Sequence, residues 1–287
     1  MTEHLSIARI GRLGDGICDT PAGPLYVPYA LPGEIIEAEP WPGHGDRRNL
    51  IQVETASPER IAPICPHFGI CGGCALQHWS RASYRQWKRS LVVHELAQVG
   101  LDVAVDEVID AHGEGRRRAV FHARRGPRDV LEVGFAARKS HHVVAIDRCP
   151  VLAPSLGGAI AVAWAIAERI SHVRKPLDIA VTATAAGLDV DLRGSGPLAA
   201  VDAAGLADVA RRHHLARLTR HGEIVAQCAT PTVRIGGARV ELPPGAFLQA
   251  TVAGETALAR LVETHCAGAA TVADLFCGVG PDRKSVV

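Results

Sequence analysis

This sequence of 287 residues has few lysines, a net charge close to zero and no long apolar run. Its 31 basic residues are nearly all arginine and its net charge is +1, so no global positive field draws it to nucleic acid. The longest apolar run, residues 157–167, is too short for a bilayer, which needs about 20 residues. No basic segment followed by an apolar one opens the chain, so no signal peptide is predicted. We therefore expect a cytoplasmic protein that does not bind a membrane.

The distribution of turn residues predicts three regions of different character. Residues 1–56 contain about five short strand-like segments bounded by glycine, proline or aspartate, which is typical of a small OB-like barrel. Residues 57–245 alternate strand-like and helix-like segments and predict a mixed α/β domain. Residues 246–287 contain an amphipathic helix, then a buried strand and a glycine-rich turn, which is how a Rossmann-like domain begins. The predicted fold class is therefore mixed α/β and multidomain.

The periodicity of the central region predicts individual elements. Helices are expected at 80–99, 151–170 and 197–214, strands at 118–125, 130–139 and 141–147, and hairpins at 177–194 and 232–242. In the first of these helices, Tyr84, Trp87, Leu91 and Leu96 recur at near-helical spacing. We expect this apolar stripe to pack in a core.

Three of the eight cysteines fall within ten positions. Cys65, Cys71 and Cys74 have the spacing C-x5-C-x2-C, and Cys149, which precedes a proline, is the candidate fourth ligand. Four such cysteines suit a [4Fe–4S] cluster, and the glycines of the loop let backbone amides approach its sulfides. The spacing leaves a zinc site with four cysteine ligands and a thioredoxin-type dithiol open. Disulfides are disfavoured in a reducing compartment.

A second candidate site is basic. Arg116–Arg118, Arg124, Arg125 and Arg128 could line a path for RNA phosphates. Because arginine replaces lysine throughout this chain, their number alone is weak evidence, and a solvated strand edge is an equal alternative.

Taken in order, the motifs resemble the bacterial RNA uracil-5-methyltransferases, especially the 23S ribosomal RNA type. The matching stretches are "VPYALPGEIIEAE" in a TRAM-like barrel, "CPHFGICGGCALQHW", "GRRRAVFHAR", "FLQAT" and "VADLFCGVG", which together span about residues 5 to 280. The resemblance implies that Cys65, Cys71, Cys74 and Cys149 hold a structural [4Fe–4S] cluster. It also implies S-adenosylmethionine as methyl donor, a monomer, and ribosomal RNA as partner, with transfer RNA as the alternative.

The resemblance also assigns cofactor contacts. Gln249 matches the glutamine of a phenylalanine-x-glutamine motif that contacts S-adenosylmethionine, and Thr251 stands where the family has asparagine. Phe276, Gly278 and Gly280 belong to the first methyltransferase motif, where glycines let the backbone approach the cofactor. Cys277 is expected to pack in this turn and not to act as a nucleophile.

In the family, the nucleophilic cysteine and the general base lie downstream of the stretch matched here, so no catalytic residue is assigned within the chain. We expect a C-terminally truncated chain that is inactive in methyl transfer and exposes the apolar side of residues 251–266. The main alternative is a non-catalytic RNA-binding protein with a structural metal centre held by four cysteines. An electron-transfer protein is less supported, since no second cluster motif occurs.

Overall fold

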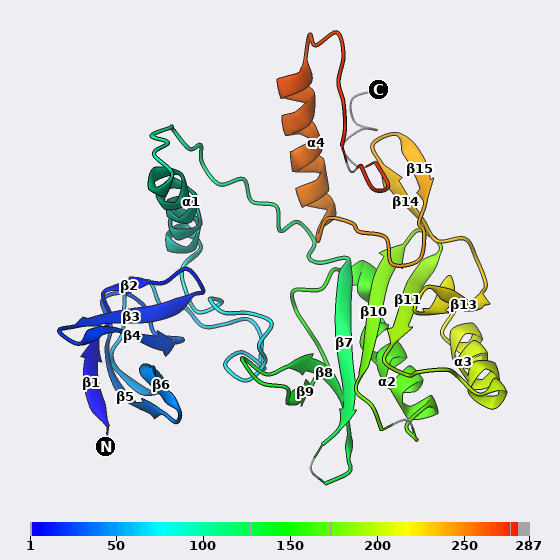
Figure 1. Ribbon diagram of the computed structural model, residues 1–287, viewed down its shortest axis with the longest axis horizontal. Coiled ribbons are helices and arrows are strands. Elements are labelled where there is room, and N and C mark those ends of the chain that lie inside the picture. The colour runs from blue at the N-terminus through cyan, green and yellow to red at the C-terminus, as the bar shows by residue number, and fades with distance from the viewer. Residues whose placement is uncertain (1, 127, 173, 276, 281–287) are drawn as a thin grey trace. The chain divides into compact units, whose positions relative to one another are not determined.

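The computed structural model describes residues 2–280 except 127, 173 and 276, and it divides the chain into two compact units (Figure 1). Unit 1 is Met1–Val108 and unit 2 is Ile109–Val287. Each unit combines β-strands with at least one helix, which confirms the expected mixed α/β class. The division at residues 56 and 245 stays a prediction. None of the described helices is long and apolar enough to cross a membrane.

Unit 1 begins with a six-stranded sheet in the order β1-β5-β6-β4-β3-β2. Its strands are β1 (Glu3–Ser6), β2 (Arg9–Ile10), β3 (Asp15–Thr20), β4 (Gly23–Pro28), β5 (Ile35–Trp41) and β6 (His44–Thr55). Neighbouring strands are antiparallel except β4 and β6, which are parallel. A small apolar cluster that includes Ile7, Val27 and Ile36 lies inside this sheet.

The first expected strand is split in two, because the chain changes its pairing partner there. Up to Ser6 it pairs with β5, and the Ile7 amide still donates to the Glu34 carbonyl oxygen at 3.0 Å. From Ala8 onward it pairs with β3, since the Ala8 amide donates to the Ile17 carbonyl oxygen at 2.8 Å. This crossing links the two halves of the sheet, which is the geometry expected of a barrel corner.

The buried carboxylate of Glu34 links the first sheet to the segment that follows it through an ion pair with Arg60. The side chain of Glu34 is fully buried and accepts hydrogen bonds from Arg60 at 2.5 and 2.7 Å and from the Leu31 amide at 2.8 Å. Arg60 also donates to the Tyr29 carbonyl oxygen at 2.8 Å. Burial alone would raise the pKa of Glu34, but the hydrogen bonds from Arg60 and from the Leu31 and Ser57 amides outweigh it and lower the pKa.

The helix α1 (Arg81–Gln98) follows, with nearly the predicted bounds. Ser80 is its N-cap, since the side-chain oxygen accepts from the Ser83 amide at 3.2 Å. The expectation that its apolar stripe packs in a core is wrong, because α1 has no buried residue and Tyr84 is 36% exposed. Trp87 is half-buried with its ring centre 6.2 Å from that of Trp79, and Leu91 and Leu96 are also half-buried.

Unit 2 is built on a seven-stranded sheet in the order β13-β12-β11-β10-β7-β8-β9. These strands are β7 (Arg118–Arg125), β8 (Leu131–Ala136), β9 (Val143–Ala145), β10 (Leu177–Thr184), β11 (Gly187–Arg193), β12 (Arg217–Arg220) and β13 (Glu223–Gln227). A short 3-10 turn (Pro154–Leu156) precedes α2 (Ala159–Arg169), and α3 (Ala200–Arg212) connects β11 to β12. The pairs β7–β8 and β10–β11 are antiparallel, as predicted.

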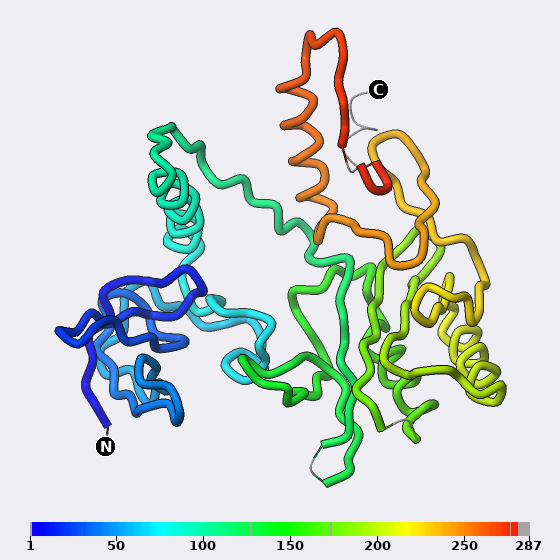
Figure 2. The backbone as a smooth tube through the Cα atoms, viewed as in Figure 1, coloured from blue at the N-terminus to red at the C-terminus, as the bar shows by residue number. Residues whose placement is uncertain are grey.

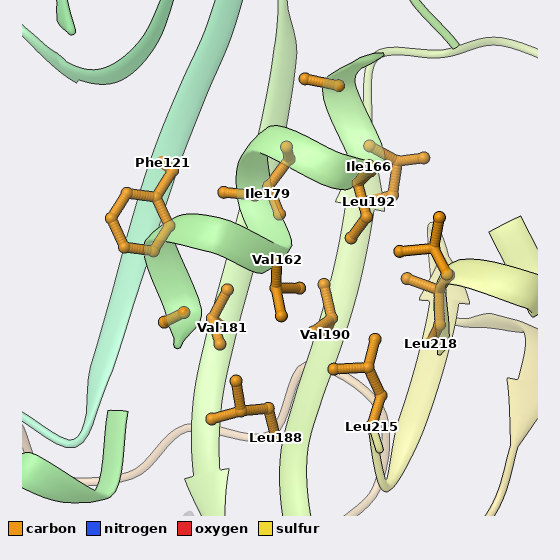
Figure 3. Packing of buried hydrophobic residues seen from close by; sticks show 14 of the residues in the cluster. Phe121, Val162, Ile166, Ile179, Val181, Leu188, Val190, Leu192, Leu215 and Leu218 are labelled. Atoms are coloured by element: carbon orange, nitrogen blue, oxygen red, sulfur yellow. The ribbon is translucent and has the colours of Figure 1, made fainter. Parts of the chain in front are cut away.

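Helix α2 packs against the sheet, and the side chains between them form the main core of unit 2. Its Val162 and Ile166 lie over Ile179 and Val181 of β10 and Val190 and Leu192 of β11 (Figure 3). In β10, every second residue from Leu177 onward is buried, which is the period of a strand with one face in a core. Complete burial of such a side chain contributes about 1.5–3 kcal/mol.

Strands β12 and β13 were not predicted, and their side chains explain why. In β12, Leu218 packs in the main core, whereas Arg217 and Thr219 on the opposite face are polar and only 4% and 1% exposed, so the run of apolar residues that marks a buried strand is missing. The Arg217 guanidinium is paired with Asp189 of β11 at 2.8 and 2.9 Å, and it also donates to the Leu242 carbonyl oxygen. Buried polar pairing replaces apolar packing on this face of the strand.

Unit 2 ends with the hairpin of β14 (Thr232–Ile235) and β15 (Ala238–Glu241) and the helix α4 (Val252–Cys266), all as predicted. The predicted buried strand after α4 is wrong for the residues described. Val272 and Leu275 are 49% and 79% exposed, and no strand is found among the described residues after Cys266. A strand needs a hydrogen-bonded neighbour, and the described part of the chain offers none at this point.

We expect Glu34→Gln to lower the free energy of unfolding of unit 1 by about 3 kcal/mol at neutral pH, because Arg60 loses its charged partner. The folded-state pKa of Glu34 lies below its ordinary value of 4.5, so its stabilisation is present above pH 4.5 and is lost as the pH falls further. Urea unfolding across pH 3–7 measures this difference. An equal loss in the exposed control Glu39→Gln would contradict the account.

Candidate functional site

The segment Ala246–Thr251, which contains Gln249, is held by arginine side chains at the start of β7. We call it the cofactor segment, after the cofactor contact that the resemblance implies for Gln249. The Arg117 amide donates to the Ala250 carbonyl oxygen at 2.9 Å, and Arg117 Nε donates to the Gln249 carbonyl oxygen at 3.1 Å. Arg118 Nη1 donates to the Leu248 carbonyl oxygen at 2.9 Å. Three consecutive carbonyl groups are therefore bound by two consecutive residues.

The charge on Arg117 is neutralised by a carboxylate from α4. Arg117 Nη2 lies 2.5 Å from Glu255 Oε2, and the two side chains are 6% and 8% exposed. Arg118 has no such carboxylate partner among the described residues, and its guanidinium lies 5.1 Å from the centre of the Phe247 ring. Burial, and then the charges of Arg116 and Arg117, lower the pKa of Arg118.

The side chains of the cofactor segment differ in their exposure to solvent. Leu248 is 1% exposed and packs in an apolar cluster. The other buried members of this cluster come from the hairpin of β14 and β15 and the residue after it, and they are Val233, Ile235, Val240 and Leu242. Phe247 is 66% exposed, which is unusual for phenylalanine. Gln249, next to the buried Leu248, is half-buried.

The glycine turn predicted from "DLFCGVG" lies beside this segment. Val279, between Gly278 and Gly280, packs against the same apolar cluster as Leu248, so two motifs about 30 residues apart come together. Figure 2 shows the chain returning from α4 to the hairpin. Gly278 and Gly280 have φ angles of 54° and 74°, in the region where glycine is favoured. Phe276, the fourth predicted cofactor residue, lies outside the described residues.

Thr251 connects the cofactor segment to α4. It is the N-cap of that helix, since its Oγ1 accepts from the Gly254 amide at 2.9 Å. The same hydroxyl donates to the Ala111 carbonyl oxygen at 2.5 Å. The residue that departs from the family's asparagine therefore has a structural role at the start of the helix.

Cys65, Cys71 and Cys74 lie in one loop of unit 1, and all are half-buried and reduced. The Gly73 amide donates to Cys71 Sγ at 3.4 Å. Burial raises the pKa of the Cys71 thiol, and the neighbouring Cys74 and Cys65 thiols raise it further. Cys149 belongs to unit 2 and follows β9. No group of three metal-binding side chains is found among the described residues, so the predicted cluster is not confirmed.

The cysteine loop is anchored to the sheet of unit 1 by residues that the sequence did not single out. His78 is 1% exposed, and its ring centre lies 5.1 Å from that of Phe68 in the loop and 6.3 Å from that of Tyr29. Burial, and then the charge of Arg60, lower the pKa of His78 to about 4, so the ring is neutral at physiological pH. These residues lie within the motif stretches quoted above, but their contact could not be read from the sequence, because Tyr29 meets the other two rings only through folding.

Three residues of the arginine run have structural roles, which neither alternative considered for the run included. Arg117 and Arg118 bind the cofactor segment, and Arg125 Nε donates to the Ser171 carbonyl oxygen at 3.2 Å. Arg116 and Arg128 are exposed and Arg124 is half-buried, which leaves these three as candidates for RNA contact.

Comparison with known proteins gives a consistent result. No protein-family model matches the chain. An uncharacterised RNA methyltransferase of Caulobacter vibrioides is 40% identical over an alignment of 285 positions, which covers 97% of this chain and 68% of that protein. The 23S rRNA (uracil(1939)-C(5))-methyltransferase RlmD of Shewanella amazonensis is 32% identical over 96% of this chain and 65% of its own length.

The chain belongs to a family of bacterial RNA methyltransferases that includes 23S rRNA uracil-5-methyltransferases. Its fold resembles that of Pyrococcus abyssi tRNA (uracil-54, C5)-methyltransferase in complex with S-adenosyl-L-homocysteine, with a TM-score of 0.71 and 19% identity over 97% of this chain and 69% of that one. The chain spans about two thirds of the length of these relatives, 65–68% for the two bacterial proteins. The expectation that it is truncated is not confirmed by these matches.

We expect Thr251→Ala to destabilise unit 2 by about 1–2 kcal/mol, because α4 loses its N-cap and the bond to the Ala111 carbonyl group. Thr251→Asn retains a capping oxygen and should lose less than half as much. Thermal unfolding of both variants measures the difference. Equal stability of Thr251→Ala and the parent chain would show that the cap is unimportant.

Proposed function

We propose that this chain is part of an S-adenosylmethionine-dependent methyltransferase that forms 5-methyluridine in ribosomal RNA. The observation that carries the proposal is the shared packing of Leu248 and Val279, which brings the cofactor segment and the glycine turn to one place. The named activity of the 23S rRNA relative supports uracil C5 as the target. Transfer RNA is the alternative substrate, favoured by the fold of the archaeal enzyme.

The proposed role of this site is to bind the methyl donor. S-adenosylmethionine would supply the methyl group. The side-chain amide of Gln249 can donate to and accept from polar groups of the cofactor. Gly278 and Gly280 remove the Cβ atoms that would keep the backbone away from it. We assign no nucleophile or base within the described residues. The Cys277 thiol lies 3.9 Å from the Gly278 carbonyl oxygen, and a carbonyl oxygen does not act as the base that a nucleophilic thiol needs.

We further propose that Cys65, Cys71, Cys74 and Cys149 ligate a [4Fe–4S] cluster. Their spacing in the sequence supports this ligand set. The bond from the Gly73 amide to Cys71 Sγ is also of the kind that surrounds such clusters. A zinc ion on the same thiolates is the competing assignment. The cluster would support the loop, and no chemical step is assigned to it.

Removal of one loop thiol should abolish cluster binding. We expect the protein purified without oxygen to be brown and to contain about four irons per chain, and Cys71→Ser to lose most of them. Cys228→Ser is the matched control, since Cys228 is an exposed single cysteine. Assays of iron, sulfide and zinc on each sample decide the assignment. A colourless protein with zinc would reject the iron–sulfur cluster.

The role of Gln249 can be tested by calorimetric titration with S-adenosylhomocysteine. We expect Gln249→Ala to weaken binding about tenfold, which corresponds to about 1.4 kcal/mol for a lost pair of polar contacts. The control Gln227→Ala removes an exposed amide on β13 and should bind like the parent chain. Unchanged affinity in Gln249→Ala would remove Gln249 from the cofactor site.

A further inference from the structure

We propose that Arg117, Arg118 and Glu255 form a clamp that sets the position of the cofactor segment, and that they are positioning residues for S-adenosylmethionine binding. This inference rests on the proposed function, because it names what holds Gln249 in place. Glu255 lies outside the motifs quoted from the sequence. Arg117 and Arg118 belong to the run that was considered for RNA phosphates, and neither was expected to bind the cofactor segment.

The clamp acts on the backbone of the cofactor segment. The carbonyl groups of Leu248, Gln249 and Ala250 each accept one hydrogen bond from Arg117 or Arg118, at 2.9–3.1 Å. Gln249 is bound through its main-chain oxygen, so these bonds leave its side-chain amide outside the clamp. Fixing three successive carbonyl groups fixes the direction in which the Gln249 side chain leaves the backbone.

Glu255 is the part of the clamp that makes burial of Arg117 favourable. A buried guanidinium group without a counter-charge is costly, and here two further arginines flank it in sequence. Glu255 lies in the first turn of α4, where a carboxylate is also favoured by the helix dipole. The pair therefore connects β7 and the cofactor segment to α4, across a sequence separation of 138 residues.

The clamp also sets the cofactor segment against the glycine turn. Leu248 contributes its carbonyl group to Arg118 and its side chain to the apolar cluster that includes Val279. A shift of the segment along β7 would move Leu248 out of that cluster and Gln249 away from the turn. The Arg117–Glu255 pair should consequently influence cofactor affinity without touching the cofactor.

Two backbone amides report on the clamp directly. The Arg117 amide donates to Ala250 in the cofactor segment, whereas the Ala183 amide donates to the Arg117 carbonyl oxygen at 2.9 Å within the sheet. Loosening of the segment exposes the first amide and spares the second. Residue-resolved hydrogen exchange therefore separates a loose segment from a sheet that is less stable as a whole.

The test variant is Glu255→Gln and the matched control is Asp189→Asn. Both remove the charge of a carboxylate that is paired with a buried arginine in unit 2, but Asp189 pairs with Arg217. We expect Glu255→Gln to speed exchange of the Arg117 amide about tenfold relative to that of Ala183. In Asp189→Asn the two amides should change together. Exchange at Arg117 that rises no more than at Ala183 in Glu255→Gln overturns the clamp.

Arg118→Met provides a second variant should Glu255→Gln fail to fold. It removes the bond to the Leu248 carbonyl group and keeps most of the apolar stem of a half-buried side chain. The same selective increase at the Arg117 amide is expected. A change that is equal at both amides would again overturn the clamp.

Titration with S-adenosylhomocysteine tests the functional consequence. We expect about tenfold weaker binding in Glu255→Gln and unchanged binding in Asp189→Asn, although both lose stability. Equal affinity of Glu255→Gln and the parent chain would overturn the positioning role. A parent chain that does not bind S-adenosylhomocysteine would contradict the proposed function instead, and the exchange measurements would still decide the clamp.

Discussion

A buried charged side chain must find hydrogen-bond partners and an opposite charge, and the described part of the chain depends on this requirement at the three places named next. Arg60 with Glu34, Arg117 with Glu255 and Arg217 with Asp189 each join elements that are distant in sequence. Each of these arginines also binds a main-chain carbonyl group, at Tyr29, Gln249 and Leu242 respectively. Breaking one such pair leaves a buried charge without compensation, which costs more than an exposed pair contributes.

These pairs lie where irregular segments must keep a defined shape. Glu34 and Arg60 lie between the first sheet and the cysteine loop, and Arg117 binds the cofactor segment. Neither the cysteine loop nor the cofactor segment contains a helix or a strand of either sheet. Side-chain donors from neighbouring residues replace the regular hydrogen bonds that such segments lack. The arginine richness of the chain therefore serves its architecture as well as any contact with RNA.

Much of the fold could be predicted from sequence where one face of an element is apolar. The strands of the first sheet, β10, β11, the hairpin of β14 and β15, and helices α3 and α4 all follow from period and turn residues. Strand β12 could not be predicted, because the polar residues Arg217 and Thr219 occupy its second buried face. The strand expected after α4 does not form among the described residues, because no neighbouring strand is present there to pair with it. Local propensity alone does not supply hydrogen-bond partners. The roles of Arg117 and Glu255 depend on a contact across 138 residues that no local pattern encodes.

The central claim is that the cofactor segment and the glycine turn form one binding site. Hydrogen exchange with and without S-adenosylhomocysteine tests it most directly. The account predicts that the ligand slows exchange in both residues 246–251 and residues 277–280, with little change in the sheet of unit 1. Protection confined to one of these segments, or found only elsewhere in the chain, would contradict it.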